Sequence, residues 1–103
     1  MKTTQEFFQE ICETYELTSA YSVAKILDVT SPTAQRWRNG NHSFDDESAV
    51  KVAAILGYEP AYILACMAAE RASKKEDSTS ASHWIKLADM LETGKNKMFK
   101  LAV

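Results

Sequence analysis

The sequence predicts an all-α protein, and three observations support this fold class. Apolar residues recur three and four positions apart through most of the chain, which is the spacing of one face of a helix. The 103 residues include only three glycines and two prolines, and runs of β-branched residues are absent. Hydrophobic residues make up 46% and charged residues 25%, as in ordinary globular proteins. We therefore expect helices packed around one compact core.

The first two expected helices span residues 3–16 and 20–27. In the first helix, the apolar residues lie on one side and a row of glutamates lies on the opposite side. Thr4 is its expected N-cap, without a reciprocal glutamate. In the second, Ser19 is the expected N-cap. The residues that this second helix should bury are Ala20, Val23, Ala24 and Leu27.

A third, short helix is expected between Ser31 and Gly40. Ser31 can cap its start, and Pro32 suits its first position because the missing N–H needs no partner there. Gly40 can end the helix in the left-handed conformation. Two helices joined by so short a turn must cross steeply. The third helix then turns Ala34 and Trp37 towards the core, and the residues it projects outward are Ser31, Thr33, Gln35 and Arg36.

Two more helices are expected at 46–56 and 60–74, the first of them capped by Asp45 or Asp46 and ended by Gly57. The polar segment 75–82 indicates a linker, and an amphipathic helix is expected from about residue 82 to 93. The expected organisation is a helical domain over residues 1–74, the linker 75–82, and a C-terminal helix and tail over 83–103.

The stretch from Ser22 to Gly40, SVAKILDVTSPTAQRWRNG, resembles the helix-turn-helix of phage repressor and Cro proteins, the lambda-repressor-like class. Ala24 matches the family's small residue where the two helices touch, Val29 its buried turn residue, and Asn39-Gly40 its frequent ending. Asp28 stands where the family often has glycine, but aspartate tolerates the left-handed conformation better than most residues. The resemblance implies a compact five-helix lambda-repressor-like DNA-binding domain, followed by a C-terminal amphipathic helix.

The resemblance also implies which residues contact double-stranded DNA. The candidates for reading base edges in the major groove are Ser31, Pro32, Thr33, Gln35 and Arg36, although Pro32 offers apolar contact alone. The candidates for phosphate binding are Ser22, Lys25, Arg38, Asn39, Asn41 and His42. Two alternatives stay open at this point: each of these side chains can simply be hydrated, and capping alone would explain Ser31.

The net charge of −2 counts against a simple nucleic-acid binder, which is usually basic. The local charge at the third helix is nevertheless positive, because Arg36 and Arg38 lie there while the acidic residues collect elsewhere. On the last helix, an apolar stripe either completes the core or joins two copies of the chain. Because the class that the chain resembles binds two-fold DNA sites, we expect a homodimer. The candidate dimerisation residues are Trp84, Leu87 and Leu91.

Catalysis is not expected, because His42 and His83 stand apart from any metal-binding spacing and there is no glycine-rich phosphate loop. No cofactor, metal or small-molecule ligand is therefore expected. Cys12 and Cys66 are expected to be reduced thiols. We expect a cytoplasmic protein of a bacterial host cell, without membrane contact, because no apolar run could span a bilayer and MKTTQEFFQE does not resemble a signal peptide.

Two functions follow as hypotheses. The first is a sequence-specific transcriptional regulator of phage or mobile-element type, a repressor that binds a palindromic operator as a dimer. The alternative is a protein-interaction module on the same fold, such as an antirepressor or an antitoxin-like adaptor, which the acidic balance and Asp28 favour.

Overall fold

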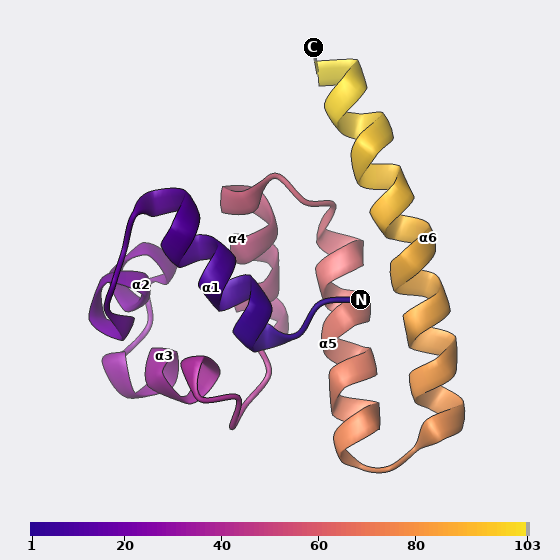
Figure 1. Ribbon diagram of the computed structural model, residues 1–103, viewed down its shortest axis with the longest axis horizontal. Helices are drawn as coiled ribbons and strands as arrows, with labels where there is room; N and C mark the ends of the chain where they lie inside the picture. The colour runs from indigo at the N-terminus through magenta and orange to yellow at the C-terminus, as the bar shows by residue number, and fades with distance from the viewer. Residues whose placement is uncertain (103) are drawn as a thin grey trace.

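Six α-helices form the part of the chain that the computed structural model describes, and that part contains no strand (Figure 1). The described part comprises the backbone of residues 1–102 and the side chains of residues 1–92. The helices are α1 (Thr4–Tyr15), α2 (Ala20–Leu27), α3 (Ser31–Arg38), α4 (Asp46–Leu56), α5 (Pro60–Lys74) and α6 (Ser78–Ala102). The expected all-α class is confirmed. None of the described helices is long and apolar enough to cross a lipid bilayer.

Several helix ends lie where the sequence predicts them. The Ser19 hydroxyl accepts a hydrogen bond from the amide of Ser22 at 3.1 Å and so caps α2. The Asp45 carboxylate accepts one from the amide of Ser48 at 2.9 Å and caps α4. Helix α4 ends at Gly57, whose φ of 77° lies in the left-handed region that glycine adopts without strain.

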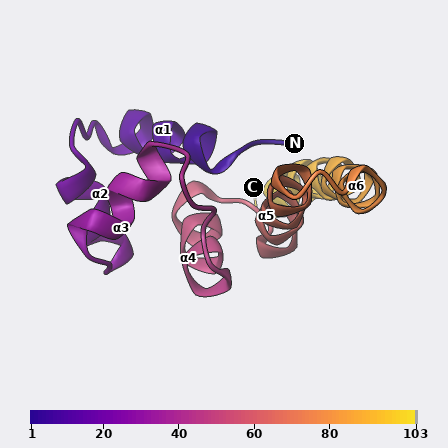
Figure 2. The same cartoon turned by 90° about the horizontal axis from the view of Figure 1, so that it is seen from below.

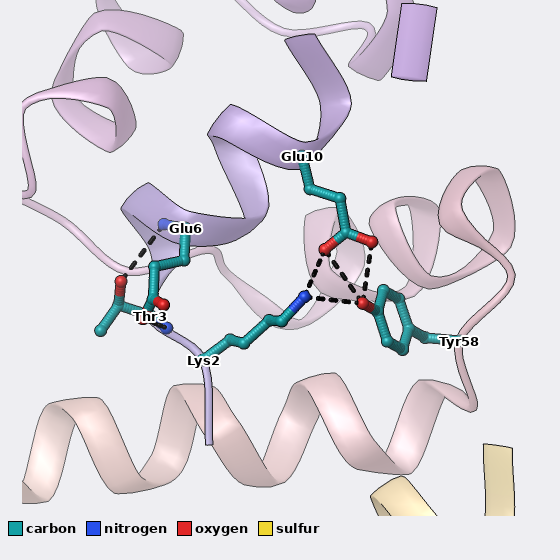
Figure 3. Close-up of polar contacts among 5 residues, drawn as sticks. All are labelled: Lys2, Thr3, Glu6, Glu10 and Tyr58. Atoms are coloured by element: carbon teal, nitrogen blue, oxygen red, sulfur yellow. Dashed lines mark hydrogen bonds and ion pairs between the residues drawn. The ribbon is translucent and has the colours of Figure 1, made fainter. Parts of the chain in front are cut away.

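Two other expected caps are wrong by one residue. Thr3, and not Thr4, caps α1: its hydroxyl accepts a hydrogen bond from the amide of Glu6 at 3.2 Å, and the Glu6 carboxylate accepts one from the amide of Thr3 at 3.0 Å (Figure 3). This is a complete capping box, because the shift by one residue makes Glu6 the reciprocal partner. Likewise Thr30, and not Ser31, caps α3, by accepting a hydrogen bond from the amide of Thr33 at 3.4 Å.

The core lies between α1, the α2–α3 pair, α4 and α5. Its largest fully buried side chains include Phe7, Ile11, Leu27, Phe44, Tyr62 and Ile63. Edge-to-face contacts join several of the aromatic rings: the Phe7 centroid lies 5.6 Å from that of Tyr58 and 6.0 Å from that of Tyr62. One core cluster therefore connects the first helix to the fifth.

The N-terminal segment is attached to this core by a polar network (Figure 3). The Lys2 ammonium donates to Glu10 at 2.8 Å and to the Tyr58 hydroxyl at 3.0 Å, and that hydroxyl donates to Glu10 at 2.8 Å. The hydrogen bond to Glu10 is the main reason that the pKa of Lys2 is raised, while burial raises the pKa of Tyr58.

The connection between α5 and α6 is shorter than the polar linker expected at 75–82. Helix α6 begins at Ser78, where the Asp77 carboxylate accepts a hydrogen bond from the amide of Ser80 at 3.1 Å, as an N-cap does. Figures 1 and 2 show α6 running back antiparallel beside α5, on the side of the molecule away from α2 and α3. Ala81 and Ala88 on α6 are buried, so this helix covers part of the core.

Candidate nucleic-acid interface

The turn between α2 and α3 is fixed by backbone geometry. Asp28 adopts the left-handed conformation expected of it, with φ 56° and ψ 51°. The amide of Val29 donates to the carbonyl of Ala24 at 3.0 Å, and the Lys51 ammonium donates to the carbonyl of Leu27 at 3.1 Å. The last carbonyls of α2 are thus paired, which fixes the direction in which the chain enters α3.

Helix α3 packs on the rest of the protein through one face. Ala34 and Trp37 are buried, as is Ala24 on α2. Helices α2 and α3 are in contact, and Ala24 and Ala34 are small residues at buried positions on them. The Trp37 ring lies edge-on to Phe44, with 4.9 Å between the ring centroids. These contacts hold α3 on α1 and α2 and leave its opposite face to solvent.

The exposed face of α3 carries most of the side chains expected to read bases. Ser31, Pro32, Gln35 and Arg36 are exposed. Gln35 donates to the side-chain oxygen of Asn39 at 3.2 Å, which keeps both side chains on the same side of the helix. Thr33 differs, because it is half-buried and its hydroxyl lies 2.9 Å from that of Thr30.

The side chains expected to bind phosphate surround this face. Ser22 is half-buried, with its hydroxyl 2.9 Å from that of Ser19 at the start of α2. Lys25 is exposed, with its ammonium 4.6 Å from the centroid of the Tyr21 ring. The remaining candidates are also exposed and lie at the end of α3 or in the loop that follows: Arg38, Asn39, Asn41 and His42.

A shallow hollow joins α3 to that loop. It is lined by Thr33, Arg36, Trp37, His42, Ser43 and Asp45. Arg36 and His42 therefore share one surface, as a DNA interface requires. Asp45 adds a negative charge at the rim, which opposes the positive charge of Arg36. Hydrogen bonds from Ser48 hold the pKa of Asp45 below its ordinary value, which favours the charged carboxylate.

Two residues beside the loop were not predicted from the sequence. The Gln5 amide donates to the carbonyl of Arg38 at 3.1 Å, and the Lys74 ammonium donates to the carbonyl of Gly40 at 3.1 Å. Gly40 has φ 77°, a left-handed conformation that glycine adopts without strain, and the end of the Gln5 side chain lies against it. No local pattern could reveal these contacts, because the partners lie 33 and 34 positions apart.

The expected dimerisation residues divide between the core and the surface. Leu91 is partly buried and packs against the core. Trp84 and Leu87 are each 40% exposed, and Met90, beside them on α6, is 72% exposed. Helix α6 therefore completes the core with one side and presents apolar side chains to solvent on its flank.

The described side chains contain no group of three His, Cys, Asp or Glu residues that could hold a metal ion. Cys12 and Cys66 are free thiols, and burial raises the pKa of both.

Comparisons with protein-family models, with curated proteins and with solved structures give no match to this chain.

Proposed function

We propose that this chain is a sequence-specific DNA-binding regulator of the lambda-repressor-like helix-turn-helix class, with α3 as the helix that enters the major groove. One observation carries the proposal: Ala34 and Trp37 hold α3 to the protein while Gln35 and Arg36 lie exposed beside them. A helix so presented fits the major groove, which is about 12 Å wide.

The exposed side chains have the chemistry that base reading needs. The Arg36 guanidinium can donate two parallel hydrogen bonds to a guanine, and the Gln35 amide can pair with the edge of an adenine. Ser31, Thr33 and Pro32 would contact neighbouring bases, Pro32 through apolar contact alone. Phosphates would be bound by the amides at the start of α2 and by the surrounding side chains Ser22, Lys25, Arg38, Asn39, Asn41 and His42.

The proposal includes a homodimer on a palindromic operator. Two copies related by a two-fold axis would place their α3 helices in major grooves one turn apart. The exposed flank of α6, with Trp84 and Leu87, supplies apolar surface for the contact between copies. A bound dimer that overlaps a promoter would exclude polymerase, so repression in the cytoplasm of a bacterial host, of the phage or mobile-element type, is the expected outcome.

Selection of bound duplexes from a random pool at low salt tests this function. We expect one enriched palindromic sequence, with affinity that falls steeply as salt rises, because phosphate binding releases counterions. Failure to retain any duplex would contradict the proposal. Sedimentation at tens of micromolar tests the dimer separately, and a monomer there would contradict the α6 contact.

Replacing Arg36 by alanine tests its role within the selected site. We expect a loss of about 1–3 kcal/mol on that site and relaxed preference at one base pair. Lys86→Ala is the matched control, because Lys86 is an exposed cation on α6, which lies on the far side of α5 from α3 (Figure 1). An equal loss for Arg36→Ala on random DNA would assign Arg36 to phosphate contact instead.

The second candidate is a protein-interaction module, such as an antirepressor or an antitoxin-like adaptor. It is favoured by the exposed Asp28 in the turn before α3, because a carboxylate there opposes approach to phosphates. If this second function is correct, the protein should bind no DNA duplex at low salt, whether it is a dimer or a monomer. Replacing Asp28 by asparagine would then leave DNA binding absent, whereas a DNA-binding regulator should bind more tightly after this change.

A further inference from the structure

Three side chains of α5 make hydrogen bonds to the loop that follows α3. Glu70 accepts a hydrogen bond from the hydroxyl of Ser43, and Arg71 donates to the carbonyl of Phe44. Lys74, one turn beyond Glu70, donates to the carbonyl of Gly40 at 3.1 Å. The C-terminal half of α5 therefore lies directly against residues 40–44, although at least 26 positions separate the two segments in the sequence.

Glu70 is itself fixed by the start of α1. It accepts hydrogen bonds from the amide of Thr4 at 3.0 Å and from the hydroxyl of Thr4 at 2.7 Å. Thr4 is buried, so this carboxylate has little room to move. The start of α1, the loop and α5 thus form one junction, and Lys74 keeps a defined position beside Gly40.

The charge of Lys74 is not neutralised in this junction. Among the described side chains it takes part in no ion pair, whereas Arg71 lies 4.0 Å from Asp46 and Lys51 lies 3.6 Å from Glu47. Its hydrogen bond to Gly40 uses one of the three ammonium N–H groups, and the side chain is exposed. Two donors and a full positive charge therefore remain available next to the loop.

We propose that Lys74 is a further phosphate-binding residue, and that the DNA-binding surface extends from α3 along residues 39–42 to the end of α5. The partner is the sugar–phosphate backbone of double-stranded DNA, which the ammonium recognises as a point charge without reading sequence. This inference rests on the proposed function. It adds a contact that comes from a helix outside the α2–α3 pair.

Lys74→Ala, Lys74→Arg and the control Lys86→Ala test this inference by DNA binding across a range of salt concentrations. Lys74→Ala should weaken binding several-fold on the selected site and on random DNA alike. It should also lower the slope of log affinity against log salt by about one. Lys74→Arg should retain both the affinity and the slope, and Lys86→Ala should change neither.

The possible outcomes separate this inference from the proposed function. If Lys74→Ala leaves the salt slope unchanged but the wild-type protein binds DNA, the inference about Lys74 is overturned and the proposed function stands. A loss confined to the selected site would have the same consequence, since that pattern reports a displaced loop and not a lost phosphate contact. Absence of wild-type binding to any duplex would overturn both. Thermal unfolding measured by circular dichroism should be close to wild type for every variant, because both lysines are exposed.

Discussion

Phe44 joins the loop after α3 to the core, and its replacement by alanine should destabilise the protein strongly. Its side chain is fully buried, and its ring meets Trp37 edge-on at 4.9 Å between centroids. Phenylalanine-to-alanine changes at such sites cost about 3–5 kcal/mol, which includes about 0.5–1.5 kcal/mol from the aromatic pair. A domain of this size has about 5–15 kcal/mol of stability in total, so Phe44→Ala should remove a large share of it.

Urea unfolding followed by circular dichroism measures the lost free energy, and thermal unfolding measures the matching shift in unfolding temperature. For a domain of about 100 residues, a loss of about 3 kcal/mol lowers the unfolding temperature by about 12 °C or more. Tyr21→Ala is the matched control, because Tyr21 is an aromatic residue that is 58% exposed, and we expect it to change stability by about 1 kcal/mol or less. A loss below about 1 kcal/mol for Phe44→Ala would refute the claim that the core fixes this end of the loop.

Two further predictions concern the contact between α2 and α3 and the cap of α4. Ala34→Leu should cost about 1–3 kcal/mol by overpacking the buried face of α3, which contacts α1 and α2. Gln35→Leu, on the exposed face, should be near neutral, and equal urea midpoints for the two variants would contradict this arrangement. Asp45→Ala should lose about 0.5–2 kcal/mol near neutral pH through loss of the N-cap. Because hydrogen bonds from Ser48 lower the pKa of Asp45, the carboxylate stabilises the folded state above its ordinary pKa of 3.8, and this contribution is lost as the pH falls through the folded-state pKa. The difference between wild type and Asp45→Ala should therefore shrink in acid, and a difference that grew there would contradict the sign.

Apolar periodicity was sufficient to predict where the first five helices lie. The spacing of Ala34 and Trp37 indicated the buried face of α3, and Gly57 indicated where α4 ends. These signals are local, because each depends on a residue's own conformational preference or on neighbours within one or two turns. They also indicated that Gln35 and Arg36 would be exposed.

The cap of α1 was readable from the sequence but was missed, because Thr3 and Glu6 have the spacing of a capping box. The role of Thr4 was not readable, since its hydroxyl donates to Glu70, 66 positions away. The segment 75–82 has the polar composition of a linker. Its second half is nevertheless helical, because Asp77 provides a cap and Ala81 is buried next to α5.

The position of Lys74 beside Gly40 was equally beyond local patterns. A lysine near the end of a helix is ordinarily a solvated residue that suits the helix dipole. Its place beside the candidate interface follows from the path of α5 through the whole fold and from the contacts of Glu70 and Arg71 with the loop. Long-range packing of this kind has no signature in a single sequence.

The central claim is that the exposed face of α3 and the adjoining loop are the surface that meets DNA. The most direct measurement is an NMR titration of the ¹⁵N-labelled protein with the duplex recovered from selection, at moderate salt. The account predicts that the largest amide shifts fall in residues 31–42, with smaller groups at the start of α2 and at the end of α5. Shifts concentrated on α6, or none at any duplex concentration, would contradict it.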